Sequence, residues 1–188
     1  VTLEGFVIES AQRGVLVANS ESSKQIRDVV LRGLHVRPLD TELAGNGITV
    51  RDAENITIED SIVHGALAAG VLLKRVVNAY VRNNLVYGNG FKPGSPDWGI
   101  SFDNTADDGG HPPVSTGNIA AFNTVYNNRH GLRFVNTAGE IRDNIAAMNT
   151  GSGIKFDQGG LATLVHHNDS FGNAINYETP SPFQLWAS

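Results

Sequence analysis

The feature that most constrains this chain is a short motif, a glycine followed by alternating apolar residues, that recurs along its whole length. The shortest interval between copies runs from Gly131 to Gly153, and the longer intervals carry insertions. A unit this short cannot bury its apolar face alone, so neighbouring copies must stack to make a core. Six clear copies and a degenerate seventh span residues 14–17, 47–50, 70–73, 99–102, 131–134, 153–156 and 174–177.

A second alternating pattern lies between these motifs and adds two strands to each unit. Its clearer copies span residues 55–63, 78–86, 118–125, 140–146 and 164–170, with weaker copies at 1–8 and 29–36. Three short strands per unit, stacked in parallel about 4.8 Å apart, make a coil. The repeat therefore predicts an all-β fold, a right-handed parallel β-helix of about seven rungs, as a single domain over residues 1–188.

Stacking aligns equivalent residues into ladders. One inward ladder comprises Val15, Ile48, Val71, Ile100, Leu132, Ile154 and Ile175, and a second comprises Val17, Val50, Leu73, Phe102, Phe134, Phe156 and Tyr177. A buried asparagine ladder is predicted at Asn84, Asn123, Asn144 and Asn168, where each side-chain amide can bond the backbone of the next rung. The earlier rungs carry Phe6, Leu34 and Ser61 there, so this ladder is expected only in the C-terminal half.

Composition narrows the function classes. The chain has no cysteine, so disulfides, thiolate metal sites and a cysteine nucleophile are excluded. The formal net charge of -5 argues against a nucleic-acid partner. No segment approaches the length of a membrane span, and we expect no membrane partner.

Two insertions, at residues 90–97 and 104–117, flank the strand that begins at Gly99, so they are expected to wall a groove on the outward face of its sheet. The predicted floor comprises Asp103, Arg133, Lys155 and Asp157, and the predicted walls comprise Phe91, Lys92, Asp97, Trp98, Asp107, Asp108, His111 and His130. An aromatic ring among polar groups suits sugars, because the ring stacks on a pyranose and the polar groups bond its hydroxyls.

Simpler interpretations exist for the same residues. The charges also fit a solvated sheet face with cross-rung ion pairs, and Trp98 also fits a lid over the core. A further outward row comprises His64, Tyr87, Tyr126 and Phe171, interrupted by Ala147. It can be a second sugar platform, although stacking that covers the side of the coil is the favoured interpretation.

The glycine-led strands and the turn at residues 83–89 resemble the right-handed parallel β-helix repeats of the pectate-lyase-like superfamily. That fold hosts lyases, hydrolases, epimerases, tailspikes and binding modules. In size and groove composition the chain is similar to β-helical carbohydrate-binding modules of plant cell-wall hydrolases, including a xylan-binding family. The resemblance implies a secreted, non-catalytic module that binds a polysaccharide such as xylan and is tethered to a glycoside hydrolase domain.

A catalytic alternative uses the same groove. Asp103 and Asp157 lie two rungs apart, about 9.6 Å, near the separation of about 6.5–9.5 Å in inverting glycosidases. A lyase or epimerase uses a basic residue to remove a proton beside the carboxylate of a uronate, and Arg133 and Lys155 are the candidates for this chemistry. No cofactor is required, although Asp103, Asp107, Asp108 and Asp157 can hold Ca²⁺. The motifs of polygalacturonase-like hydrolases and alginate epimerases are absent from the sequence. A structural or adhesin-like spacer is the third hypothesis.

Overall fold

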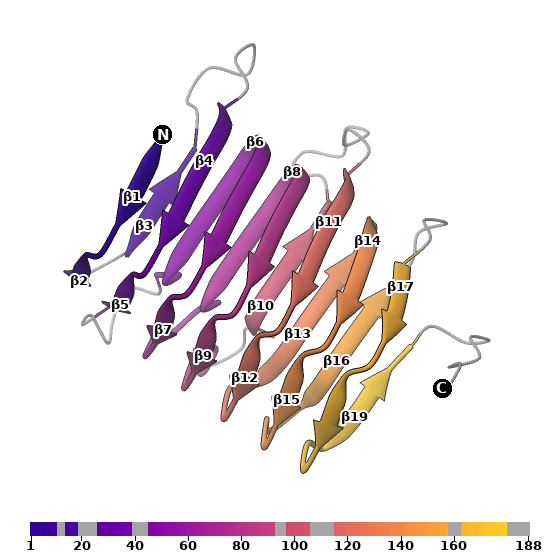
Figure 1. Cartoon of the computed structure of the whole chain (residues 1–188). Coiled ribbons are helices and arrows are strands. Elements are labelled where there is room, and N and C mark those ends of the chain that lie inside the picture. Colours follow the sequence, from indigo (N-terminus) through magenta and orange to yellow (C-terminus); the bar gives the residue numbers. More distant parts are fainter. Residues whose placement is uncertain are drawn as a thin grey trace.

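Alternating apolar residues form short parallel strands that stack along one axis in the computed structural model (Figure 1). The structure describes residues 1–10, 14–18, 26–38, 45–92, 97–105, 115–157 and 163–179. Within these ranges every regular element is a strand, and no helix is long and apolar enough to cross a membrane.

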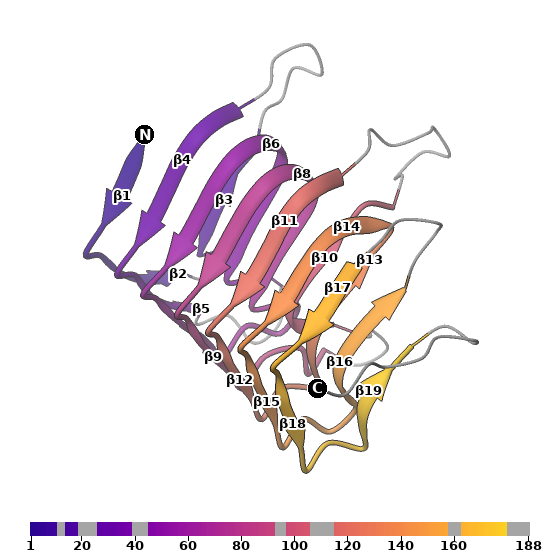
Figure 2. The ribbon, with the colours of Figure 1, turned by 45° about the vertical axis from the view of Figure 1, so that its right-hand side comes forward.

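Three sets of strands make the sides of the coil, and Figure 2 shows them winding around a common interior. The first two sets share two long strands and so belong to one 12-stranded sheet, but we call the three sides the first, second and third sheet. The first sheet holds the glycine-led strands, which are β3 (Val15–Val17), the first part of β6 (Ile48–Glu59), the first part of β8 (Val71–Arg82), β10 (Trp98–Asp103), β13 (His130–Val135), β16 (Ser152–Asp157) and β19 (Ile175–Glu178). The second sheet comprises β1 (Thr2–Glu4), β4 (Ile26–Arg32), the later parts of β6 and β8, β11 (Ser115–Ala121), β14 (Thr137–Arg142) and β17 (Thr163–His166).

The third sheet contains seven short strands. They are β2 (Val7–Ser10), β5 (His35–Pro38), β7 (Ile62–His64), β9 (Leu85–Tyr87), β12 (Thr124–Tyr126), β15 (Ile145–Ala147) and β18 (Asp169–Phe171). Each strand pairs in parallel with its equivalent in the next rung, as the repeat predicts.

The core contains the two predicted inward ladders through Ile154 and Phe156, together with inward residues of the other two sheets such as Ile58 and Val63. The rings of Phe102 and Phe134 lie 4.3 Å apart between centroids. The last rung differs from the prediction. Tyr177 pairs with Ile154, not with Phe156, and Ile175 is exposed. The physical reason is that Asn173 anchors this rung opposite Asn149, while the motif at 174–177 has no glycine to fix the register.

The predicted asparagine ladder is confirmed. The Oδ1 atom of each member accepts a hydrogen bond from the backbone N–H of the preceding member, as at Asn123 and Asn144, 3.0 Å apart. The ladder extends further than predicted, because Ser61 N–H donates to Asn84 and the Ser61 hydroxyl accepts from Leu34 N–H. A hydroxyl oxygen can therefore replace the amide oxygen as the acceptor in this turn.

A second asparagine ladder was not predicted. Its members precede the glycine-led strands and bond one another in the same way, at Asn89, Asn128, Asn149 and Asn173. Each lies five residues after a member of the first ladder, and this constant spacing is the signal that sequence reasoning missed. The two ladders satisfy the buried backbone groups at both ends of the third sheet.

Candidate functional site

The outward rows of the first sheet follow the predicted register. Ser101, Arg133 and Lys155 align on β10, β13 and β16. Lys74 and Asp103 align in the adjacent row. In the last rung Glu178 lies opposite Lys155, where the sequence predicts Asn176. The register shift therefore places an acidic side chain beside the lysine.

Asp103 is fully engaged by its neighbours. Its Oδ2 atom accepts a hydrogen bond of 2.7 Å from Arg133, one rung away. Its Oδ1 atom accepts from the backbone N–H and the hydroxyl of Thr105, at 2.9 and 2.7 Å. Arg133 also donates to the hydroxyl of Ser101 at 3.1 Å. These contacts hold the carboxylate in place, and the charge-assisted hydrogen bond fixes Arg133 against it.

Trp98 is buried, with 4% of its surface exposed, so its predicted role as an exposed sugar-stacking platform is corrected. Its ring stacks on His130 of the next rung, with 4.5 Å between centroids, and the Arg133 guanidinium lies 5.3 Å from its ring centre. These neighbours occupy the ring surface that a pyranose would need. The arrangement agrees with the alternative of a lid over the core.

His130 is fixed in one orientation. Its Nδ1 atom accepts a hydrogen bond of 3.0 Å from the backbone N–H of Ser152. Burial, followed by the nearby positive charge of Arg129, lowers the pKa of His130 below its ordinary value. The ring is therefore neutral near pH 7, and the proton resides on Nε2, which is a donor.

Lys155 is paired with Glu178. The ammonium donates to one Glu178 carboxylate oxygen at 2.7 Å, and the Ser152 hydroxyl donates to the other oxygen. Burial opposes ionisation of Glu178, but the hydrogen bonds from Lys155 and Ser152 outweigh it and lower its pKa. Two ion pairs, Asp103 with Arg133 and Lys155 with Glu178, thus lie along this face, and the charges cancel within each pair.

Buried polar atoms without a hydrogen-bond partner in the described part of the chain include Trp98 Nε1, Asp97 Oδ2 and Arg51 Nε. Arg51 aligns with Lys74 and, one rung further, with Asp103. Trp98 and Asp103 lie at opposite ends of β10, so Trp98 and Arg51 are separated along the strands as well as by two rungs.

Among the other predicted residues, Phe91 is 45% exposed, and the Lys92 carbonyl accepts from Arg129. Asp107, Asp108 and His111 lie outside the described residues, as does the Asp157 side chain, so the carboxylate pair and the calcium site stay predictions. Within the described ranges, no group of three His, Asp or Glu side chains is arranged to hold a metal ion.

The aromatic row on the third sheet is stacked. His64 lies over Tyr87 with 4.7 Å between ring centroids, and Tyr87 lies over Tyr126 at 5.1 Å. The Tyr87 ring therefore has a ring on each side, whereas Tyr126 has Ala147 as its neighbour in the following rung. This geometry supports the interpretation of a covering stack over that of a second sugar platform.

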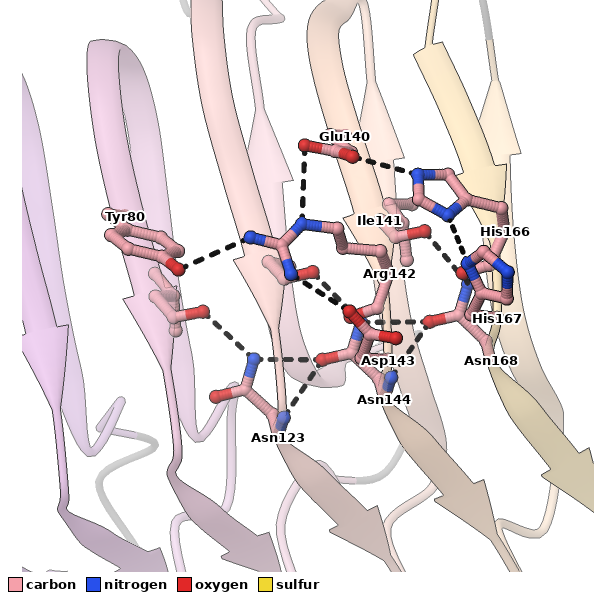
Figure 3. Close-up of polar contacts among 12 residues, drawn as sticks. Tyr80, Asn123, Glu140, Ile141, Arg142, Asp143, Asn144, His166, His167 and Asn168 are labelled. Atoms are coloured by element: carbon pink, nitrogen blue, oxygen red, sulfur yellow. Dashed lines mark hydrogen bonds and ion pairs between the residues drawn. The ribbon is translucent and has the colours of Figure 1, made fainter.

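A second polar cluster, which sequence reasoning missed, lies on the outward side of the second sheet (Figure 3). Glu140 accepts from His166 at 2.8 Å and pairs with Arg142 at 3.4 Å. Arg142 also donates to Asp143 at 2.8 Å and reaches Tyr80 two rungs away. Alignment of the repeats at residues 140–146 and 164–170 places Arg142 opposite His166, so the sequence pattern already indicated that these two residues are neighbours.

A three-sided coil of parallel strands defines a β-helical protein. Residues 5–181 match the family described as "Right handed beta helix region", and the chain belongs to that family. The predicted right-handed β-helix is thereby confirmed. No curated protein matches the sequence.

Solved structures show the same fold at low sequence identity. The enzymatically active domain of tailspike protein 2 from bacteriophage CBA120 is 13% identical, with a TM-score of 0.62, and the match covers 96% of this chain and 34% of that one. A mutant of the periplasmic alginate epimerase AlgG is 18% identical, with a TM-score of 0.52 and coverages of 94% and 46%. The catalytic domain of Agl-KA is 15% identical, with a TM-score of 0.51 and coverages of 89% and 40%. The chain therefore spans less than half of each, and these likenesses establish the fold alone.

Proposed function

We propose that the chain binds a polysaccharide along the outward face of β10, β13 and β16 without acting on it. The observation that carries this proposal is the strip of hydrogen-bonding groups on this face, in which Arg133 is held by Asp103 and Ser101, and Lys155 by Glu178. A sugar hydroxyl both donates and accepts hydrogen bonds, so hydroxyls can bond to the guanidinium and ammonium donors and to the carboxylate acceptors alike. Phe91, which is exposed, supplies the ring for stacking.

The charge pattern favours a neutral polymer such as xylan. Arg133 is neutralised by Asp103 and Lys155 by Glu178. A polyuronate would have to displace these internal carboxylates in order to reach the cations, at the expense of two charge-assisted contacts. A neutral chain needs only the donors and acceptors that the pairs still present.

The carboxylates are arranged for binding rather than catalysis. The pKa of Glu178 is lowered, so it stays ionised and is a poor general acid. Asp103 uses both oxygens to hold Thr105 and Arg133. The Nδ1 lone pair of His130 is occupied by the Ser152 N–H, which leaves Nε2 as a donor. In keeping with this interpretation, we propose that the chain is a secreted module tethered to a glycoside hydrolase domain.

A second candidate is an enzyme that acts on a polysaccharide in the same groove. It is favoured by the descriptions of the similar structures, which name an enzymatically active tailspike domain, an alginate epimerase and a catalytic domain. An alginate epimerase acts on an acidic polymer, so this candidate predicts turnover of a polyuronate.

One polysaccharide panel tests both candidates. Affinity electrophoresis with xylan, mannan, β-glucan, alginate and polygalacturonate measures binding, and reducing-end and unsaturated-product assays measure turnover. The expected result is retardation by a neutral polymer with no product. Retention by none of the polymers, or turnover of any polymer, would contradict the proposal.

The substitution Phe91→Ala tests the location of the site. It removes the exposed ring that is proposed to stack on a sugar. Loss of this stacking should weaken binding about threefold to tenfold. The matched control is Tyr126→Phe, which removes a hydroxyl from the aromatic row of the third sheet and should leave binding unchanged. The reverse pattern would place the site on the third sheet.

A further inference from the structure

The side chains of His166 and His167 meet at the end of β17, where two imidazole nitrogens face each other. The Nδ1 atoms of the two rings are 2.7 Å apart, and the rings are nearly perpendicular (Figure 3). Consecutive residues of a strand normally point to opposite faces. His167 escapes this rule because it has a positive φ of 51°, in the left-handed region, and so begins the turn.

Glu140 determines which nitrogen of His166 carries the proton. Its carboxylate lies 2.8 Å from His166 Nε2, and a carboxylate can only accept, so the proton resides on Nε2. The Nδ1 atom of His166 therefore carries a lone pair and no proton, and His167 Nδ1 donates a hydrogen bond to it. An imidazole that donates one ring N–H to a carboxylate and presents the other nitrogen is the usual arrangement of a metal-ligating histidine.

From this arrangement we propose that His166 Nδ1 and His167 Nδ1 form a binding site for a divalent transition metal ion such as Zn²⁺, Ni²⁺ or Cu²⁺. The ion takes the place of the proton that the two nitrogens share, and that proton moves to Nε2 of His167. Imidazole nitrogens suit these ions, whereas Mg²⁺ and Ca²⁺ prefer oxygen. With metal–nitrogen distances of about 2.0–2.1 Å, the two nitrogens need to separate by only about half an ångström.

The surroundings favour a cation. Glu140 and Asp143 supply two carboxylates, and Arg142 supplies one opposing charge. Both histidines reach solvent, so water can fill the remaining coordination positions. Two protein ligands are fewer than a structural zinc site uses, and we therefore expect micromolar rather than nanomolar affinity.

A second histidine pair provides a matched comparison. His35 and His64 approach through their Nε2 atoms at 2.9 Å, on the third sheet. Burial, the charge of His35 and the charge of Arg37 together lower the pKa of His64. A cation at this pair would face the Arg37 guanidinium, and among the described contacts no carboxylate orients either ring. This pair is expected to bind metal much more weakly.

The test is calorimetric titration of the untagged protein with ZnCl₂ and NiCl₂, with MgCl₂ as the negative control. One equivalent of Zn²⁺ should bind, and His167→Ala should abolish that binding. Glu140→Gln should weaken it about tenfold to hundredfold through lost orientation of His166, with a change in the ¹⁵N shifts of the His166 ring that reports its tautomer.

His35→Ala is the control variant, and its zinc affinity should equal that of the unchanged protein. Thermal unfolding of each variant without metal checks that it folds, and His167→Gln replaces His167→Ala if the latter does not. Absence of zinc binding by the unchanged protein would overturn the proposal. Binding lost in His35→Ala and retained in His167→Ala would overturn it as well, because the site would then lie on the third sheet.

Discussion

Arg133 donates a hydrogen bond of 2.7 Å to Asp103 across one rung of the coil. The pair lies on the outward face of the first sheet, and the same guanidinium lies over the ring of Trp98. Arg133 and Asp103, which the sequence analysis predicts as ligand contacts, thus also contact each other. A ligand bound on this face as proposed would therefore meet a strip whose geometry is already fixed by these contacts.

The buried asparagine ladder should be a main source of stability. We expect Asn144→Ala to lower the free energy of unfolding by about 3 kcal/mol, because the buried Asn123 N–H and Ala120 C=O each lose a partner at about 1–3 kcal/mol. Urea unfolding measures the change. Thr150→Ala, at an exposed turn position, should change stability by less than about 0.5 kcal/mol. Equal effects of the two substitutions would contradict a structural role of the ladder.

The glycines that lead the first-sheet strands are expected to be required for close stacking. A Cβ atom at Gly131 would clash with the carbonyl oxygen of Gly153 in the next rung, so Gly131→Ala should cost about 3 kcal/mol. At Gly88, a Cβ would meet nothing within 4 Å, and only the positive φ of 64° opposes alanine. Gly88→Ala should therefore cost about 1–2 kcal/mol.

Thermal and urea unfolding of the two alanine variants give the comparison. If Gly131→Ala does not fold at all, it is still the more destabilised of the two variants, and soluble yield replaces the unfolding curve as the measurement. A Gly131→Ala protein as stable as Gly88→Ala would show that the rungs can separate at little cost.

Glu59 is a buried carboxylate shared by two arginines. Its exposed side-chain fraction is 2%, and it accepts from Arg32 and Arg82 at 2.6 Å each. We expect Glu59→Gln to lower stability by about 1.5–3 kcal/mol, because charge-assisted hydrogen bonds become neutral ones. The control is Asp52→Asn at a half-exposed pair with Arg75, which should cost at most about 1 kcal/mol.

The same substitution should change the acid dependence of stability. Burial raises the pKa of Glu59, but the hydrogen bonds from Arg32 and Arg82 outweigh it, so the net shift is below the ordinary value of 4.5. Its contribution is therefore present above pH 4.5 and lost as the pH falls through the lower, folded-state pKa. Glu59→Gln should flatten that part of the stability curve, and an unchanged acid slope would contradict this assignment.

His130 should contribute a pH dependence in a different range. Its pKa in the folded chain lies below the ordinary value of 6.5, because burial and then Arg129 disfavour the charged ring. Between the folded-state pKa and pH 6.5 the unfolded chain binds more protons, so stability rises with pH in this window. NMR titration of the His130 ring should give a midpoint below 6.5, and His130→Gln should reduce the slope. A midpoint above 6.5 would contradict the burial argument.

The sequence by itself determined the coil, most of its register and one of its asparagine ladders. Alternation decides which side of a strand faces the core, and stacking then aligns Ile100 with Leu132 and Arg133 with Lys155 without further information. These features depend only on the spacing of residues within one repeat. The second asparagine ladder was equally available, since Asn89 follows Asn84 at the same interval as Asn128 follows Asn123.

Only the tertiary structure decided the burial of Trp98, the pairing of Lys155 with Glu178 and the approach of His167 to His166. A periodic pattern assigns a residue to a face but does not say how deeply its neighbours cover it. Rungs of unequal length shift the register of the last rung. A long charged side chain can pair with any of several residues on adjacent rungs, and the sequence does not say with which. A backbone turn with positive φ then breaks the alternation on which sequence reasoning relies.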